Sequence, residues 1–175
     1  MVRSIVGAIS VALLTGMLSF GAAAQEATPA PAEGATPPPA PAPWAARCLS
    51  EGRGSALDCV MEQRVVMSNT GQLLTAVTIR MPAGSASPVM MIQTPYGLYL
   101  PAGLKLAVGE QSFDPLPLQT CDNQGCYAGE QVSEAMLAAM KGGESLQITF
   151  QDQGRRDINV PVSLLGFTAA FEKIQ

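Results

Sequence analysis

Short runs of alternating residues, separated by turn residues, most limit the folds that this chain can adopt. From residue 57 onward, apolar and polar residues alternate over short stretches, as they do in half-buried strands. The runs cover 57–67, 73–81, 89–93, 104–108, 116–120, 126–129, 146–150 and 158–164. Glycine, proline and asparagine fill the gaps between them. The pattern therefore predicts an all-β sandwich or barrel.

Two local signals add detail to this prediction. Asn69-Thr70-Gly71 is a turn sequence, so the runs 57–67 and 73–81 are expected to form a hairpin. A single short helix is expected near 133–141, because Ser133 is a good N-cap and Gly142-Gly143 ends the helical pattern. At about two turns, this helix depends on packing for its stability.

Residues 1–24 have the pattern of a secretory signal peptide. Arg3 is their only charge, the run 5–20 is apolar or small, and Ala22-x-Ala24 is the small-residue pattern of a cleavage site. We expect cleavage after Ala24. The alternative is a retained membrane anchor, but a spanning helix needs about 20 predominantly apolar residues and this run is slightly short.

The stretch 25–43 is expected to be a disordered Pro/Ala-rich linker. Seven of its residues are proline and six are alanine, so it cannot bury a core or form a regular hydrogen-bond ladder. It is either a leader without a partner, a spacer, or a Pro-rich ligand. The remaining residues, 44–175, are numerous enough for one domain with a real core.

Charge and composition exclude several classes of function. The chain has 10 Lys+Arg against 14 Asp+Glu, a net charge of −4, and no basic cluster larger than Arg155-Arg156. It is therefore a poor candidate for nucleic-acid binding. It has no histidine, which excludes Ser-His-Asp and Cys-His catalysis and His-ligated zinc. We expect neither a metal nor a cofactor.

Four cysteines are present, and an exported chain meets an oxidising compartment, so disulfides are expected. Three pairings are possible, and the spacing favours Cys48–Cys59 with Cys121–Cys126, the latter closing a tight turn. A Cys₄ zinc site is the second interpretation, but neither spacing matches a zinc knuckle. A redox-active pair is the third, but C-x₄-C is not C-x-x-C.

Several motifs follow one another in an order that is typical of a known family. Trp44 and Cys48 open the domain, Cys59 begins the first long strand, and a later strand ends in Ile79-Arg80-Met81-Pro82. Leu137 lies in the short helix.

Three longer segments are more specific in combination. PYGLYLPAGL at 95–104 fits P-x-G-x-x-L-P-x-G, LPLQTCDNQGC at 116–126 ends in C-x-x-x-G-C, and PVSLLGFTAA occupies 161–170. Together these residues resemble the invasion-associated locus B family of exported alphaproteobacterial proteins. The resemblance covers most of 44–175.

The resemblance implies an immunoglobulin-like β-sandwich of about seven to nine strands, in agreement with the strand pattern. It also implies a periplasmic, outer-membrane-associated or secreted location. A role in host-cell invasion does not transfer, because many members occur in free-living bacteria. We expect a non-catalytic cell-envelope module that binds a protein or another surface partner.

The alternative function is an envelope enzyme that uses reactive thiols or carboxylates. Glu130, Glu134 and Asp114 are the carboxylates considered, and no pattern marks any of them as buried or paired. They are expected to be exposed turn and cap residues, because Asp and Glu are normally solvated.

Two places favour a binding surface. Met90-Met91 and the tyrosines of 95–103 are residue types that adapt well to partners. The segment 95–103 is predicted to be an interaction loop, with candidate residues Tyr96, Leu98, Tyr99 and Leu100. The alternative is that its aromatic side chains only cover the edge of the sandwich.

Overall fold

The computed structural model describes residues 44–50, 52–53, 57–82, 85 and 87–175. The predicted signal peptide, 1–24, and the predicted linker, 25–43, lie outside the described residues. No helix within the described ranges is long and apolar enough to span a membrane. The described residues form two antiparallel sheets.

The larger sheet has six strands. In spatial order they are β1 (Ala45–Leu49), β2 (Asp58–Val66), β3 (Leu73–Met81), β4 (Val89–Thr94), β8 (Gly125–Gln131) and β7 (Thr120–Asp122). The first four follow chain order, so the sheet begins as a meander. The predicted hairpin of β2 and β3 is confirmed, and Gly71 in its turn has the left-handed φ of 69° that favours glycine.

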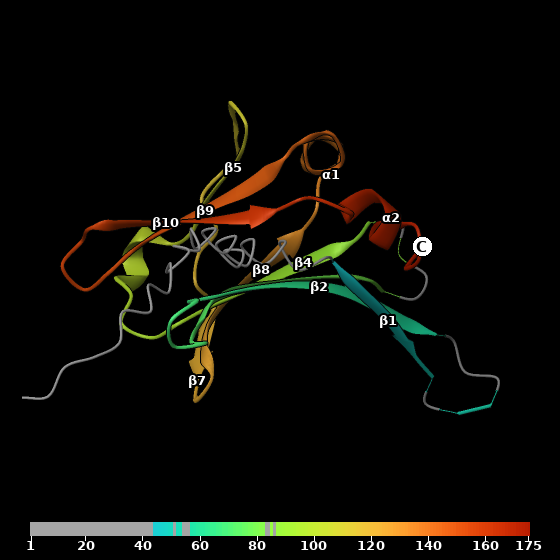
Figure 1. The fold of residues 1–175 in the computed structure, drawn as a ribbon, viewed down its shortest axis with the longest axis horizontal. Coiled ribbons are helices and arrows are strands. Elements are labelled where there is room, and N and C mark those ends of the chain that lie inside the picture. The colour runs from blue at the N-terminus through green and yellow to red at the C-terminus, as the bar shows by residue number, and fades with distance from the viewer. Residues whose placement is uncertain (1–43, 51, 54–56, 83–84, 86) are drawn as a thin grey trace, which may run out of the picture. The chain divides into compact units, whose positions relative to one another are not determined.

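The smaller sheet has four strands. In spatial order they are β10 (Asp157–Ser163), β9 (Ser145–Gln151), β5 (Lys105–Val108) and β6 (Gln111–Ser112). Figure 1 shows β9 and β10 in one layer and β1, β2, β4 and β8 in the other. The expected sandwich is therefore confirmed, with ten strands in the described part of the chain.

Three helical segments complete the described fold: η1 (Leu100–Ala102), α1 (Glu134–Gly142) and α2 (Phe167–Phe171). The expected helix is α1, and its cap is as predicted, since the Met136 backbone N–H donates to Ser133 Oγ at 3.2 Å. The helix α2 was not expected. It buries Phe167 and Phe171 in the core, so aromatic packing stabilises a helix too short to persist alone.

The core lies between the two inner faces. Alternate residues of β9 are buried, namely Leu146, Ile148 and Phe150, and Val77 and Ile79 of β3 are buried in the same cluster. This alternation is the period-2 pattern on which the strand prediction depended.

One predicted strand needs correction. The run 116–120 is not a strand: Leu116 makes only an isolated bridge to Leu104, and β7 begins at Thr120. Pro115 and Pro117 flank this bridge, and proline has no N–H to donate to a ladder. The strand β1 was also not predicted.

Trp44 joins the two layers at the start of the domain. Its indole Nε1–H donates to the Ser163 carbonyl oxygen at 2.9 Å, so the residue before β1 is bonded to the end of β10. The Trp44 ring meets Phe167 edge to face, with centroids 5.1 Å apart, and Phe167 stacks on Phe171. The cluster therefore links both sheets to α2.

A disulfide joins each edge strand of the larger sheet to the strand beside it. Cys48 in β1 faces Cys59 in β2, and the two are bonded. Cys121 in β7 faces Cys126 in β8, and this pair is bonded as well. The pairing that the spacing favoured is present, and both bonds join residues directly opposite each other across a ladder.

Gly125 tests the C-x-x-x-G-C turn. Its φ is 148°, and a Cβ there would lie 2.2 Å from the Thr94 carbonyl oxygen. We expect Gly125→Ala to lower the free energy of unfolding by about 1–3 kcal/mol, measured by urea denaturation. Gly142→Ala is the matched control, because Gly142 has open space around it and lies in a helix. Equal effects of the two substitutions would contradict this account.

Trp44 tests the link between the sheets. We expect Trp44→Ala to lower the free energy of unfolding by about 3–5 kcal/mol, because it leaves a cavity and an unpaired carbonyl. Leu165→Ala, at a site that is 68% exposed, is expected to change it by less than about 0.5 kcal/mol. Urea denaturation followed by circular dichroism measures both, and a Trp44→Ala protein as stable as the parent would refute the role of the cluster.

Candidate functional site

The predicted interaction loop divides between two surroundings. Tyr96 and Leu100 are 54% and 50% exposed, whereas Leu98 and Tyr99 are half-buried. Leu98 packs against the core and forms a bridge with Asp152, and the Tyr99 backbone N–H donates to the Gln151 carbonyl. The loop thus presents two separate exposed residues instead of one continuous apolar surface.

The end of the loop meets the turn between β9 and β10. The Arg155 guanidinium lies 4.8 Å from the centre of the Tyr99 ring, a cation–π contact. Arg156 pairs with Asp152 at 2.6 Å, and the backbone N–H and guanidinium of Arg156 lower the pKa of that carboxyl. Both arginines of this exposed turn therefore contact neighbouring residues of the domain.

The two adjacent methionines face opposite sides of the larger sheet. Met90 is fully buried in the core, whereas Met91 is 45% exposed on the outer face. The strand alternation of β4 separates them, because successive side chains point to opposite faces. Only Met91 can take part in the binding surface that the sequence suggested.

A groove crosses the outer face of the larger sheet at Met91. One part has a volume of about 560 Å³ and lies over β4, β8 and β7. A second part, of about 270 Å³, is lined by residues of β3 and β4 with Pro82. Val89 and Met91 line both parts, so the two lie side by side, and together they are here called the outer-face groove.

Main-chain and amide groups shape the part of the outer-face groove that lies over β4, β8 and β7. Gly129 lies directly opposite Met91 and has no side chain to fill the space. The Gln119 side chain donates to the Gly129 carbonyl at 2.7 Å and is fixed there. Tyr127 donates to the Asp122 carboxylate at 3.2 Å, and the Tyr96 hydroxyl donates to the Asp122 backbone carbonyl. Tyr96 of the predicted loop therefore contacts a residue of the groove wall.

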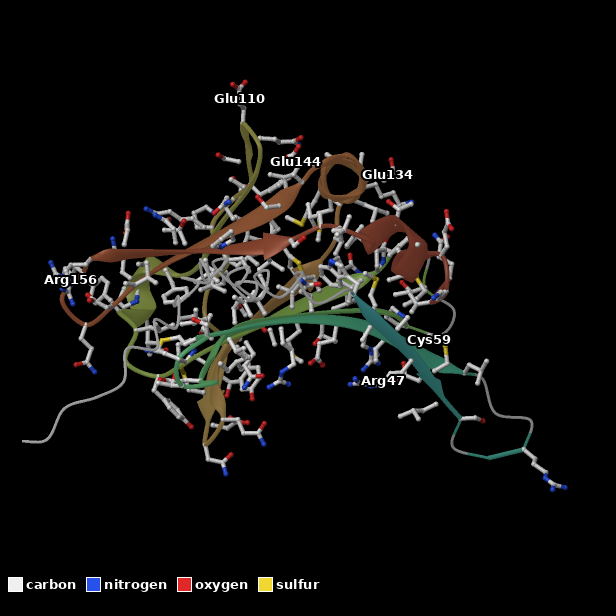
Figure 2. All side chains as sticks on the ribbon, viewed as in Figure 1. Arg47, Cys59, Glu110, Glu134, Glu144 and Arg156 are labelled. Atoms are coloured by element: carbon white, nitrogen blue, oxygen red, sulfur yellow. A yellow bond between two sulfur atoms is a disulfide. The ribbon has the colours of Figure 1, made fainter. Side chains whose placement is uncertain are left out.

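Arginines gather on this same outer face. Arg47 and Arg64 both pair with Glu62, at 3.6 and 3.2 Å, and both are well exposed. Arg80 lines the outer-face groove and forms no ion pair with the described residues. Figure 2 shows Arg47 on the outer side of the larger sheet, while Glu110, Glu134 and Glu144 lie on the other side of the sandwich.

The candidate carboxylates are not arranged as a catalytic set. Glu130, which was expected to be exposed, is half-buried in β8 on the same face as Met90, and burial, with the Asp114 carboxylate as a second cause, raises its pKa. Glu134 is exposed in the first turn of α1, as a cap residue would be. Among the described residues, no group of three acidic or cysteine side chains is placed to hold a metal, and all four cysteines are in disulfides.

The comparisons with known proteins agree on one family. The family model described as Invasion associated locus B (IalB) protein matches residues 44–175. Invasion protein B homologs from Brucella abortus strain 2308 and biovar 1 strain 9-941 are each 30% identical over 133 residues, covering 75% of either chain. The crystal structure of invasion associated protein B from Bartonella henselae matches with a TM-score of 0.66 and 21% identity, over 75% of this chain and 89% of that one.

Glu130 provides a test of how burial changes the titration of a carboxylate in β8. Because the pKa of Glu130 is higher in the folded protein than its ordinary value of 4.5, the free energy of unfolding falls as the pH rises from 4.5 through the folded-state pKa. We expect Glu130→Gln to be more stable than the parent at pH about 7, with the difference vanishing at pH about 3.5. Thermal unfolding at both pH values measures this difference.

Glu134→Gln is the matched control for this substitution. Glu134 lies at the N-terminus of α1, where a negative charge is favourable, so its loss is expected to cost about 0.3–1 kcal/mol at pH about 7. A gain in stability at Glu134, or none at Glu130, would contradict the assigned cause.

Proposed function

We propose that this chain, which belongs to the invasion associated locus B family, is a non-catalytic binding module of the cell envelope. Its binding surface is the outer-face groove. The observation that carries this proposal is the half-exposed Met91 beside Val89, in a groove on a sheet face that no other described element covers. A half-exposed methionine in a depression with polar side chains around it offers a partner an apolar contact between hydrogen-bonding groups.

Further features support a binding role. Methionine is flexible and polarisable, so Met91 can adapt to the shape of a partner. Tyr127 and Gln119 are held by hydrogen bonds before any partner arrives, so they lose little side-chain freedom on binding. A rigid rim around the adaptable Met91 side chain suits the binding of a partner better than catalysis.

The proposed location outside the cytoplasm is supported by the disulfides. Two disulfides in a domain of this size are typical of oxidising compartments. The signal-peptide pattern of 1–24 points the same way. We propose the periplasm or the cell surface as the site of action.

Photo-crosslinking tests the binding role in cells that make the protein. With a photoreactive residue at Gln131, on the rim of the groove, we expect a discrete covalent adduct on a gel, identifiable by mass spectrometry. The same residue at Lys105, which is exposed on the smaller sheet, is the control and is expected to give no such adduct. Adducts that are absent or identical at the two positions would refute the proposal.

Two substitutions separate the groove from the predicted loop. Met91→Lys, at a site 45% exposed, is expected to abolish the Gln131 adduct, whereas Leu100→Lys, at a site 50% exposed, is expected to leave it unchanged. Both replace a half-exposed apolar residue by the same cation. If Leu100→Lys alone removed the adduct, the binding surface would be the loop 95–103.

A further inference from the structure

We infer that the outer-face groove binds an extended segment of a partner protein in which an acidic residue is followed, two positions later, by an apolar residue. The acidic residue pairs with Arg80 and the apolar residue contacts Met91. This inference rests on the binding role proposed above and names the class of its partner.

The position of Arg80 carries the first step. Its neighbours across the sheet are Val60 in β2 and Val89 in β4, so no carboxylate lies directly opposite it. Two carboxylates of β2 lie one diagonal step away: Glu62, which Arg47 and Arg64 already share, and Asp58, which forms no ion pair with Arg80. The exposed guanidinium of Arg80 is therefore free of any ion pair among the described residues, and it lines the groove.

The chemistry of the unpaired Arg80 guanidinium carries the second step. Arg47 and Arg64 share Glu62, so Arg80 is the one of these three arginines without a carboxylate partner among the described residues. A guanidinium has five donors in a planar fork that fits a carboxylate with two parallel hydrogen bonds. Arginine is the residue type suited to such pairs at interfaces. A carboxylate is thus the complementary group.

The spacing of Arg80 and Met91 carries the third step. Arg80 faces Val89, which is two residues from Met91 in β4, so Arg80 and Met91 are diagonal neighbours on one face. Diagonal neighbours lie about 7–8 Å apart. Alternate residues of an extended chain point to one side about 6.6 Å apart, which matches this distance closely. The groove therefore suits an acidic residue and an apolar residue at positions i and i+2.

An anionic membrane is the competing occupant of a groove that has an unpaired guanidinium beside an apolar side chain. The Asp122 carboxylate also lines the groove, Asp58 and Glu62 lie on the same face, and the chain as a whole is acidic. A lipid surface would meet all of these charges at once, whereas a peptide in extended conformation meets only the residues beneath it. The distribution of charge thus favours the peptide.

Methyl NMR of the whole protein tests the inference. The protein is labelled with [methyl-¹³C]methionine and titrated with a ten-residue peptide that has a central Glu-Thr-Leu segment between Gly-Ser flanks. We expect the Met91 methyl signal to shift and the Met90 signal to stay in place, because Met90 is buried on the opposite face of the same strand. The signals are assigned with Met90→Leu and Met91→Leu.

Charge variants complete the test. Arg80→Glu is expected to weaken peptide binding about tenfold or more, because it removes a charge-assisted pair. Lys105→Glu changes the net charge equally on the smaller sheet and is expected to change affinity less than about twofold. Arg80→Gln provides a second variant if Arg80→Glu does not fold. A peptide with Gln in place of Glu is expected to bind about tenfold more weakly or worse.

Four results would overturn the inference. They are an unmoved Met91 signal, equal binding of the Glu and Gln peptides, equal effects of Arg80→Glu and Lys105→Glu, and a Met91 shift with vesicles of phosphatidylglycerol but not with the peptide. Adducts at Gln131 without any response to the peptide would overturn this inference alone and leave the proposed binding role standing. Failure of the crosslinking together with failure of the peptide would remove both.

Discussion

Burial of one face of each sheet against the other is the constraint on which this structure depends. Strands alternate their side chains between two faces, so the residues that form the core leave their neighbours on the outside. The helices α1 and α2 add Met136, Met140, Phe167 and Phe171 to the core and leave the outer face of the larger sheet open. The outer-face groove is therefore a direct product of the two-layer architecture.

Alternation made most of the strands and the sandwich predictable, because it reports which residues a strand buries. It failed where other forces decide the conformation. The strand β1 has only one half-buried position, and its pairing with β2 stabilises it in place of burial. The helix α2 depends on the packing of Phe167 and Phe171, which no local pattern reveals. At 116–120 the prolines outweighed the alternation.

The site was less predictable than the fold because strands distant in the chain build it. The Met90-Met91 pair suggested a binding surface, and alternation requires one of the two to face outward. Which one does so depends on the register between β4 and its neighbours. No signal in the sequence predicted that Gln119 and Gly129 would line the groove. Arg80 could be placed on a strand, but its lack of a partner follows only from the pairing across β2, β3 and β4.

The two disulfides also affect whether this protein can pair with other chains. Each bond closes a short loop, so its effect on the entropy of the unfolded chain is modest, about 2–3 kcal/mol. Its position matters more, because β1 and β7 are the terminal strands of the larger sheet. If β1 detached, the long strand β2 would offer a row of unpaired backbone groups to any other chain. The covalent bonds hold β1 against β2 and β7 against β8, and so hinder strand exchange between molecules at β2 and β8.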